Sequence, residues 1–114
     1  MTRKEIAEMI ESVGVPYACY QFPENTQQAA PFICFYNGPS RDLYADNTNY
    51  QKIDHMVVEL YTDNKDFDLE ATLEATLNGN GLTWTREGQY LDDERLWVAV
   101  YDTDVIITED QNNA

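Results

Sequence analysis

The residues best suited to chemistry in this sequence are one histidine and several groups of carboxylates. His55 is the only histidine in the 114 residues, and it follows Asp54 directly. A metal centre or a catalytic triad needs several ligating or proton-transferring groups in a set arrangement. No second histidine and no third cysteine is available to complete one. The sequence therefore favours a structural or surface role for His55.

A second candidate is the segment 42–53, which begins like a calcium-binding EF-hand loop, with acidic residues at its first and fifth positions. Such a loop requires glycine at its sixth position and a bidentate glutamate at its twelfth. The corresponding residues here are Asn47 and Ile53. Because both of these demanding positions fail, a calcium loop is excluded.

Two acidic groups remain, residues 92–94 and the trio Asp63, Asp66 and Asp68. They could serve a metal-dependent enzyme only if they converged in a pocket, and such groups more often form solvated turns and helix caps. The sequence also has no glycine-rich phosphate loop and no GxSxG, HExxH or CxxC pattern. We therefore predict that the protein is not an enzyme and uses no metal or cofactor.

The chain is strongly acidic, with 21 Asp and Glu against 7 Lys and Arg and a net charge of −14. Contact with nucleic-acid phosphates needs clustered Lys and Arg, so the charge argues against nucleic-acid binding. The acidity could confer solubility, meet a basic partner, or form a surface past which DNA slides. The scarce cations could neutralise nearby carboxylates or bridge subunits. They include Arg41, Lys52, Arg86 and Arg95.

The sequence carries no signal for a membrane or for secretion. No apolar run approaches the roughly 18 residues of a membrane span, and the N-terminal residues lack the apolar core of a secretory signal. We expect a cytoplasmic location. In that compartment Cys19 and Cys34 are expected to be buried thiols on two strands. The sequence does not establish whether they touch.

Two helices are predicted from capping residues and periodicity. Thr2 to Glu5 forms a capping box, and apolar residues follow at helical spacing until Gly14, which predicts a helix over residues 3–13. This helix could pack on a sheet or dock on a neighbouring subunit as an arm. Asp66 is a suitable N-cap for a second helix over residues 67–77.

Alternating or β-rich runs predict five strands, with residues 105–107 either extending the last one or forming a short edge strand. In the best of them, Met56, Val58 and Leu60 share an apolar face, and His55, Val57, Glu59 and Tyr61 share an amphipathic one. The predicted strands are residues 17–22, 31–37, 52–62, 82–87 and 95–101.

These elements predict an α+β domain over residues 1–107. Strands joined by short turns favour antiparallel pairing, and helices at two separate points can cover one face. We therefore expect two layers: a mainly antiparallel, four- to five-stranded sheet with two helices packed on one face. Residues 108–114 are expected to be a flexible C-terminal tail.

The connection over residues 40–51 is long, polar and aromatic, with Tyr44 and Tyr50. Connections of this length are usually functional loops or extended hairpin arms. Tyrosines suit a protein interface because each offers a large contact area and a polar tip. Both rings could instead fold back on their own sheet.

A set of segments along the chain forms a recognisable pattern: Tyr44-Ala-Asp-Asn47, Tyr50-x-Lys52 and Val58-Glu-Leu-Tyr-Thr62, followed by Lys65-Asp66 and Leu69-Glu70. The pattern extends to VPYACYQF, PFICFYNG and RLWVAVYD, and so covers nearly the whole chain. These segments resemble small tail proteins of siphophages and prophages of Gram-positive bacteria. The pattern is a structural signature and contains no catalytic motif.

The resemblance implies a tail terminator, also called a tail completion or tail-to-head joining protein. Members of that family have an α+β fold and assemble as a hexameric ring. The ring caps the tail tube, stops its elongation and presents a docking face for the head. The implied partners are further copies of the chain, the major tail protein and a head-completion or connector protein. The implied location is the head–tail interface of the virion, with the host cytoplasm during assembly.

We predict that the polar loop and the amphipathic strand face meet neighbouring subunits or the tail tube. Another head–tail connector role and an acidic DNA-mimic inhibitor are the alternatives. A mimic would need paired rows of carboxylates on one face, whereas here they cluster in turns and helix starts. The candidate interface residues are Arg41, Tyr44, Asp46, Asn47, Tyr50, Lys52, His55, Val57 and Tyr61.

Overall fold

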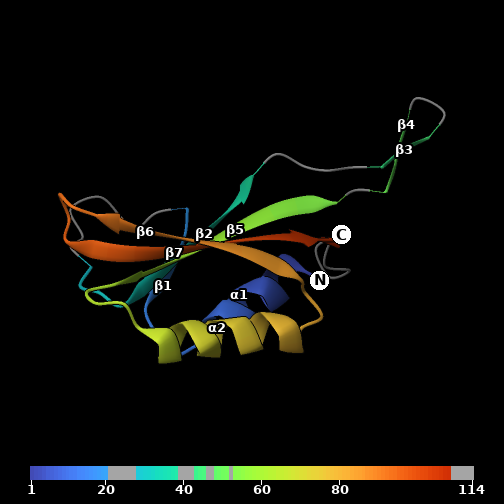
Figure 1. Ribbon diagram of the computed structural model, residues 1–114. Helices are drawn as coiled ribbons and strands as arrows, with labels where there is room; N and C mark the ends of the chain where they lie inside the picture. The colour runs from blue at the N-terminus through green and yellow to red at the C-terminus, as the bar shows by residue number, and fades with distance from the viewer. Residues whose placement is uncertain (21–27, 39–42, 46–47, 52, 109–114) are drawn as a thin grey trace.

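The structure, a computed structural model, describes residues 1–20, 28–38, 43–45, 48–51 and 53–108. Two helices lie on one side of a five-stranded sheet, and two short strands form a separate ribbon (Figure 1). The predicted α+β class, with two helices on a mainly antiparallel sheet, is confirmed. The elements are α1 (Arg3–Glu11), β1 (Tyr17–Cys19), β2 (Phe32–Gly38), β3 (Leu43–Ala45), β4 (Thr48–Gln51), β5 (Asp54–Thr62), α2 (Phe67–Gly79), β6 (Trp84–Leu91) and β7 (Leu96–Val105).

The sheet has the order β1-β2-β5-β7-β6. The pairs β2/β5, β5/β7 and β6/β7 are antiparallel, as expected. β1 and β2 are parallel, which the expectation of antiparallel neighbours missed. A parallel pair needs a crossover of about a dozen residues, and the connection over residues 20–31 has that length.

The core lies between the sheet and the two helices. Ile6, Met9 and Ile10 of α1 are buried in it, so this helix packs on its own sheet. Thr2 forms the predicted capping box with Glu5, whose pKa is lowered chiefly by the hydrogen bond from the Thr2 backbone. The sheet contributes alternate residues of its central strands. These are Ile33, Phe35, Met56, Val58, Leu60, Ala99, Tyr101 and Val105.

The helix α2 begins after Asp66, whose side chain accepts a hydrogen bond from the Leu69 amide, as predicted. Leu73 and Leu77 are fully buried. The third buried residue of this helix is Glu70, at 3% exposure. Glu70 tolerates this position because Lys65 donates two hydrogen bonds to its carboxylate.

Several element ends differ from those predicted. β6 continues through Gly88 to Leu91, because a regular ladder with β7 supports residues that by themselves suggest a turn. β7 continues to Val105, in agreement with the strand-extension alternative. β1 ends at Cys19, followed by Tyr20 with a φ of 71°. The helix α1 ends at Glu11, and Gly14 takes a φ of 94° in the turn that follows.

The expected polar loop over residues 40–51 contains the two strands β3 and β4. They pair antiparallel with one register shift, and the ribbon projects beyond the five-stranded sheet (Figure 1). Of the two options for so long a connection, this is the hairpin arm. The predicted tail over residues 108–114 lies outside the described residues except for Thr108.

Candidate functional site

One face of the five-stranded sheet is turned away from both helices. Neither helix lies on it (Figure 1). We call it the open face, and the pairing registers assign alternate residues of β2, β5 and β7 to it. Its central residues are Phe32, Cys34, Tyr36, His55, Val57, Glu59, Tyr61, Val98, Val100 and Asp102.

Glu59 stands at the centre of the open face and accepts hydrogen bonds from two tyrosines. The Tyr61 hydroxyl donates to Glu59 Oε1 over 2.8 Å, and the Tyr36 hydroxyl donates to Oε2 over 3.0 Å. Both oxygens of the carboxylate therefore have a partner within the sheet. Hydrogen bonds to a charged acceptor are stronger than neutral ones, so the two rings are held in place on the open face.

The environment of Glu59 shifts the ionisation of its neighbours. Partial burial, followed by the hydrogen bond to Glu59, raises the pKa of Tyr61 far above its usual range. The same two causes, in the same order, raise the pKa of Tyr36. Burial and then the Glu59 charge raise the pKa of the Cys34 thiol. These groups therefore stay neutral at physiological pH.

An apolar area surrounds this polar centre. The rings of Phe32 and Tyr61 stack with their centroids 4.7 Å apart and their planes 14° from parallel. Val57 and Val98 flank them and are 6% and 5% exposed, although no helix covers them. The open face thus combines aromatic rings, aliphatic side chains and one fixed carboxylate, a composition typical of protein interfaces.

His55 lies on the open face near one end of β5. Its Nε2 is 2.7 Å from Asp102 Oδ1 on the neighbouring strand β7. Gly38 lies opposite it on β2, and a Cβ atom at that position would stand 2.5 Å from His55 Nδ1. The imidazole ring therefore occupies space that only glycine leaves free at position 38.

The structure brings together three of the predicted interface residues. His55, Val57 and Tyr61 share the open face, which confirms the alternation predicted for this strand. Tyr44 and Tyr50 lie in β3 and β4. The other four predicted residues lie outside the described residues: Arg41, Asp46, Asn47 and Lys52.

Sequence reasoning missed the roles of Glu59 and Tyr36. Glu59 was assigned to the correct face of its strand but without partners. The usable signal was an acidic residue within the otherwise apolar run Met56–Leu60, because a half-buried carboxylate needs hydrogen-bond donors. Tyr36 could not be found from the sequence, since the register between β2 and β5 brings it near Glu59.

The two cysteines are free thiols, and the expectation that both are buried is wrong. Cys19 is exposed and Cys34 is half-buried. The register pairs Cys34 with Ala18, so Cys19 and Cys34 project to opposite faces of the sheet. Cys19 is exposed because β1 is an edge strand that ends at this residue.

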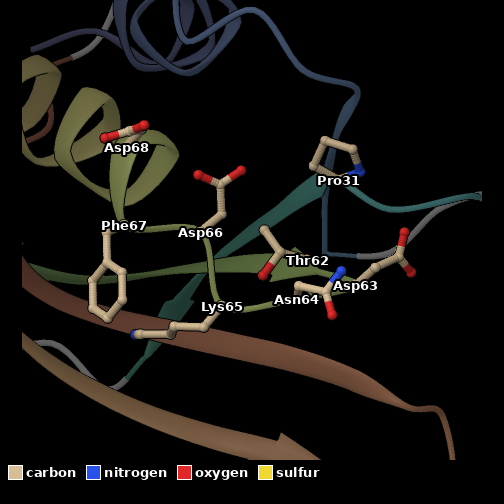
Figure 2. A pocket seen from close by; sticks show the side chains of 8 residues that line it. All are labelled: Pro31, Thr62, Asp63, Asn64, Lys65, Asp66, Phe67 and Asp68. Carbon is tan, nitrogen blue, oxygen red and sulfur yellow. The ribbon is translucent and has the colours of Figure 1, made fainter.

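Asp63, Asp66 and Asp68 line an open pocket at the start of α2. Figure 2 shows Asp63, Asp66 and Asp68 spread along the segment, with the Lys65 amine near the Phe67 ring, 5.2 Å from its centroid. Among the described residues, no three His, Cys, Asp or Glu side chains gather as a metal site would need.

The described part of the chain contains no helix long and apolar enough to cross a membrane.

A second cluster of charges lies on the helix side of the sheet. Arg86 of β6 forms ion pairs with Glu74 and, at 3.5 Å, with Glu70 of α2. Glu74 also accepts a hydrogen bond from the hydroxyl of the fully buried Tyr101. Burial, followed by this hydrogen bond, raises the pKa of Tyr101. The cluster holds α2 to the sheet, so its charges serve the fold.

Comparison with known proteins does not identify the chain. No protein-family model matches it, and no curated protein sequence matches it.

Proposed function

We propose that this protein is a structural component of a bacteriophage tail that caps the tail tube and joins the tail to the head. In this role it acts as a tail terminator and assembles as a ring, for which six copies are the expectation. Its partners are further copies of itself, the major tail protein and a head-completion protein. Its role is mechanical, and it needs neither a catalytic group nor a cofactor.

The observation that carries the proposal is the open face. A protein that polymerises or docks needs an ordered, partly apolar surface that its own fold does not cover. Glu59 and its two tyrosines fix the polar centre of that surface, and the stacked rings of Phe32 and Tyr61 lie beside it. The resemblance to phage tail proteins supports the same role, since its segments include the β5 strand that carries Glu59 and Tyr61.

The acidity of the chain fits a ring through which DNA passes. A lumen lined by carboxylates repels phosphates, so the genome would move through it without adhesion. The same charge makes copies of the chain repel one another. Assembly therefore has to use the areas with little net charge, such as the apolar part of the open face.

Electron microscopy of the purified protein mixed with isolated tail tubes tests the proposal. We expect a ring at one end of each tube and tubes of uniform length when the protein is present during polymerisation. Phage lacking the protein should form tails of irregular length that do not join heads. Normal tails and normal joining in its absence would refute the proposed function.

Two matched substitutions connect this role to the open face. Tyr61→Ala removes a ring from the open face, and Phe67→Ala removes an exposed ring at the start of α2, where Phe67 is 71% exposed. We expect Tyr61→Ala to weaken tube capping and Phe67→Ala to leave it intact, with both proteins folded by circular dichroism. Equal capping by both would exclude the open face as the docking surface.

The ribbon β3/β4 is tested in the same assay with Tyr44→Ala and Tyr50→Ala together. We expect this double variant to remain folded and to assemble poorly. Loss of the fold would instead mean that the two rings belong to the core. Binding to the head alone, without tube capping, would favour a neighbouring connector role.

A further inference from the structure

The strand β6 is a sheet edge that nothing in the described part of the chain covers. It pairs with β7 from Trp84 to Leu91 without a register shift, and it is last in the strand order. Residues 85–90 are all exposed, although alternate residues of a strand point to opposite faces. Such an edge presents a row of backbone N–H and C=O groups to any other strand.

The edge also lacks several of the features that usually protect such strands. Edge strands are normally protected by proline, by lysine or by a bulge, and β6 has none of these over its eight residues. Its only charged residues, Arg86 and Glu87, have opposite signs. The strand therefore carries no net charge in a chain whose net charge is −14.

The ribbon β3/β4 is the complementary feature. It forms a two-stranded sheet of its own and projects beyond the main sheet (Figure 1). An isolated two-stranded hairpin is only marginally stable in water, so it gains from pairing with a further strand. The sequences of its strands, LYA and TNYQ, contain no charged residue. They can therefore approach an acidic protein without like-charge repulsion at the contact.

We infer that the β6 edge of one copy receives the β3/β4 ribbon of a second copy by strand addition. The ribbon belongs to a separate two-stranded sheet that projects beyond the main sheet (Figure 1), so it is not paired with β6 of its own chain. Added backbone hydrogen bonds supply the affinity, as in other cases of β-augmentation.

The donor ribbon and the acceptor edge are different surfaces, which makes the contact heterologous. Each copy then has one donor and one acceptor, so the contact repeats and closes into a ring when the rotation allows. The inference rests on the proposed function for this closure. The strand addition itself can be measured on the purified chain, in the absence of tail tubes or heads.

Disulfide trapping between two preparations tests the contact, with Cys19→Ser and Cys34→Ser in both. One preparation carries Thr48→Cys or Asn49→Cys, which cover both faces of β4. The other carries Thr85→Cys, Glu87→Cys or Gln89→Cys along β6. Paired strands bring Cα atoms to about 4.5–5.5 Å, which is within disulfide range. We expect mixed disulfide dimers to form from at least one such combination.

The matched control replaces the β6 cysteine with Glu11→Cys, an exposed position at the end of α1. This control should give no more mixed dimer than random collision does. A second measurement uses the full chain with residues 43–51 replaced by a short glycine linker. Sedimentation should show the wild-type assembly reduced to monomers, with the circular dichroism of the main sheet retained.

Three results would overturn the inference. They are a wild-type chain that is monomeric at all concentrations, an assembly that persists without residues 43–51, and an absence of mixed dimers through β6. Failure of the proposed function gives a different pattern. Chains that cross-link through β6 but leave tail tubes uncapped would count against the tail role alone, whereas capping by the linker variant would count against strand addition alone.

Discussion

Glu59 is a carboxylate in the otherwise apolar run Met56–Leu60 of β5, and its partners explain how the sheet accommodates it. The hydroxyls of Tyr36 and Tyr61 satisfy one oxygen each. Loss of either hydroxyl would leave part of a half-buried charge without a donor. Single residues on the open face therefore affect stability as well as docking.

Alkaline pH should destabilise the protein through Tyr61. Its pKa in the folded state lies above the value of about 10 in an unfolded chain. Its contribution to stability is therefore fully present below about pH 10 and is lost as the pH rises toward the folded-state pKa. Tyr61→Phe should flatten the alkaline fall in the free energy of unfolding, measured by urea denaturation at several pH values. The exposed Tyr90→Phe is the control, and an unchanged slope in Tyr61→Phe would contradict the prediction.

Tyr101 offers a second test at this scale, on the other side of the sheet. Tyr101→Phe removes the hydroxyl that donates to Glu74 over 2.8 Å and leaves the buried ring in place. A hydrogen bond to a charged acceptor contributes about 1.5–3 kcal/mol, and Arg86 still pairs with Glu74, so we expect a loss near the lower value. Urea denaturation measures it. A loss as small as that of Tyr90→Phe would mean that this hydrogen bond contributes nothing.

At the residue scale, the sequence correctly predicted which face of the sheet a side chain occupies, but it did not predict which side chains form hydrogen bonds with one another. Alternation correctly put His55, Val57 and Tyr61 on one face, because a strand has a fixed period of two. It could not pair Tyr36 with Glu59 or His55 with Asp102, since these pairs depend on which strands are neighbours. The burial of Glu70 was also missed, although its main partner, Lys65, lies only five residues away; its second and more distant partner, Arg86, comes from another element.

At the scale of elements, α2 is held to the sheet by charged as well as apolar contacts. Lys65 donates hydrogen bonds of 2.7 and 3.0 Å to Glu70, whose side chain is 4% exposed. Lys65→Met would leave this carboxylate with Arg86 at 3.5 Å as its remaining ion-pair partner. The anchoring of the first turn of α2 would weaken.

We expect Lys65→Met to lower the free energy of unfolding by about 1–3 kcal/mol, because a buried carboxylate loses its main donor. Lys4→Met, at an exposed position of α1, changes the net charge equally and should have little effect. Chemical denaturation of the two variants side by side gives the comparison. Equal losses would show that net charge, and not the Lys65–Glu70 pair, controls stability.

The helices were easier to predict than the strand pairing. Thr2 and Asp66 mark the helix starts by local hydrogen bonds that the sequence shows directly. The parallel pairing of β1 with β2 depends on a crossover, and the extension of β6 depends on its ladder with β7. Neither is a local property. The β3/β4 ribbon was foreseen only as one of two options for a long connection.

At the scale of the whole molecule, net charge opposes association between copies. Salt screens repulsion between acidic surfaces, while backbone pairing and apolar contact depend on it little. We therefore expect self-association to strengthen as ionic strength rises, measured by sedimentation velocity at fixed protein concentration. Weaker association at high salt would contradict this prediction and would indicate that ion pairs between subunits dominate.

The close approach of Gly38 to His55 restricts how these two positions can change during evolution. A side chain at position 38 and the imidazole at position 55 compete for the same space, so the effect of either substitution depends on the other. Gly38→Ala should be tolerated far better in a His55→Ser background than alone. Among natural variants we expect the two positions to change together, with the order of mutation constrained: the histidine has to be lost before the glycine can be replaced.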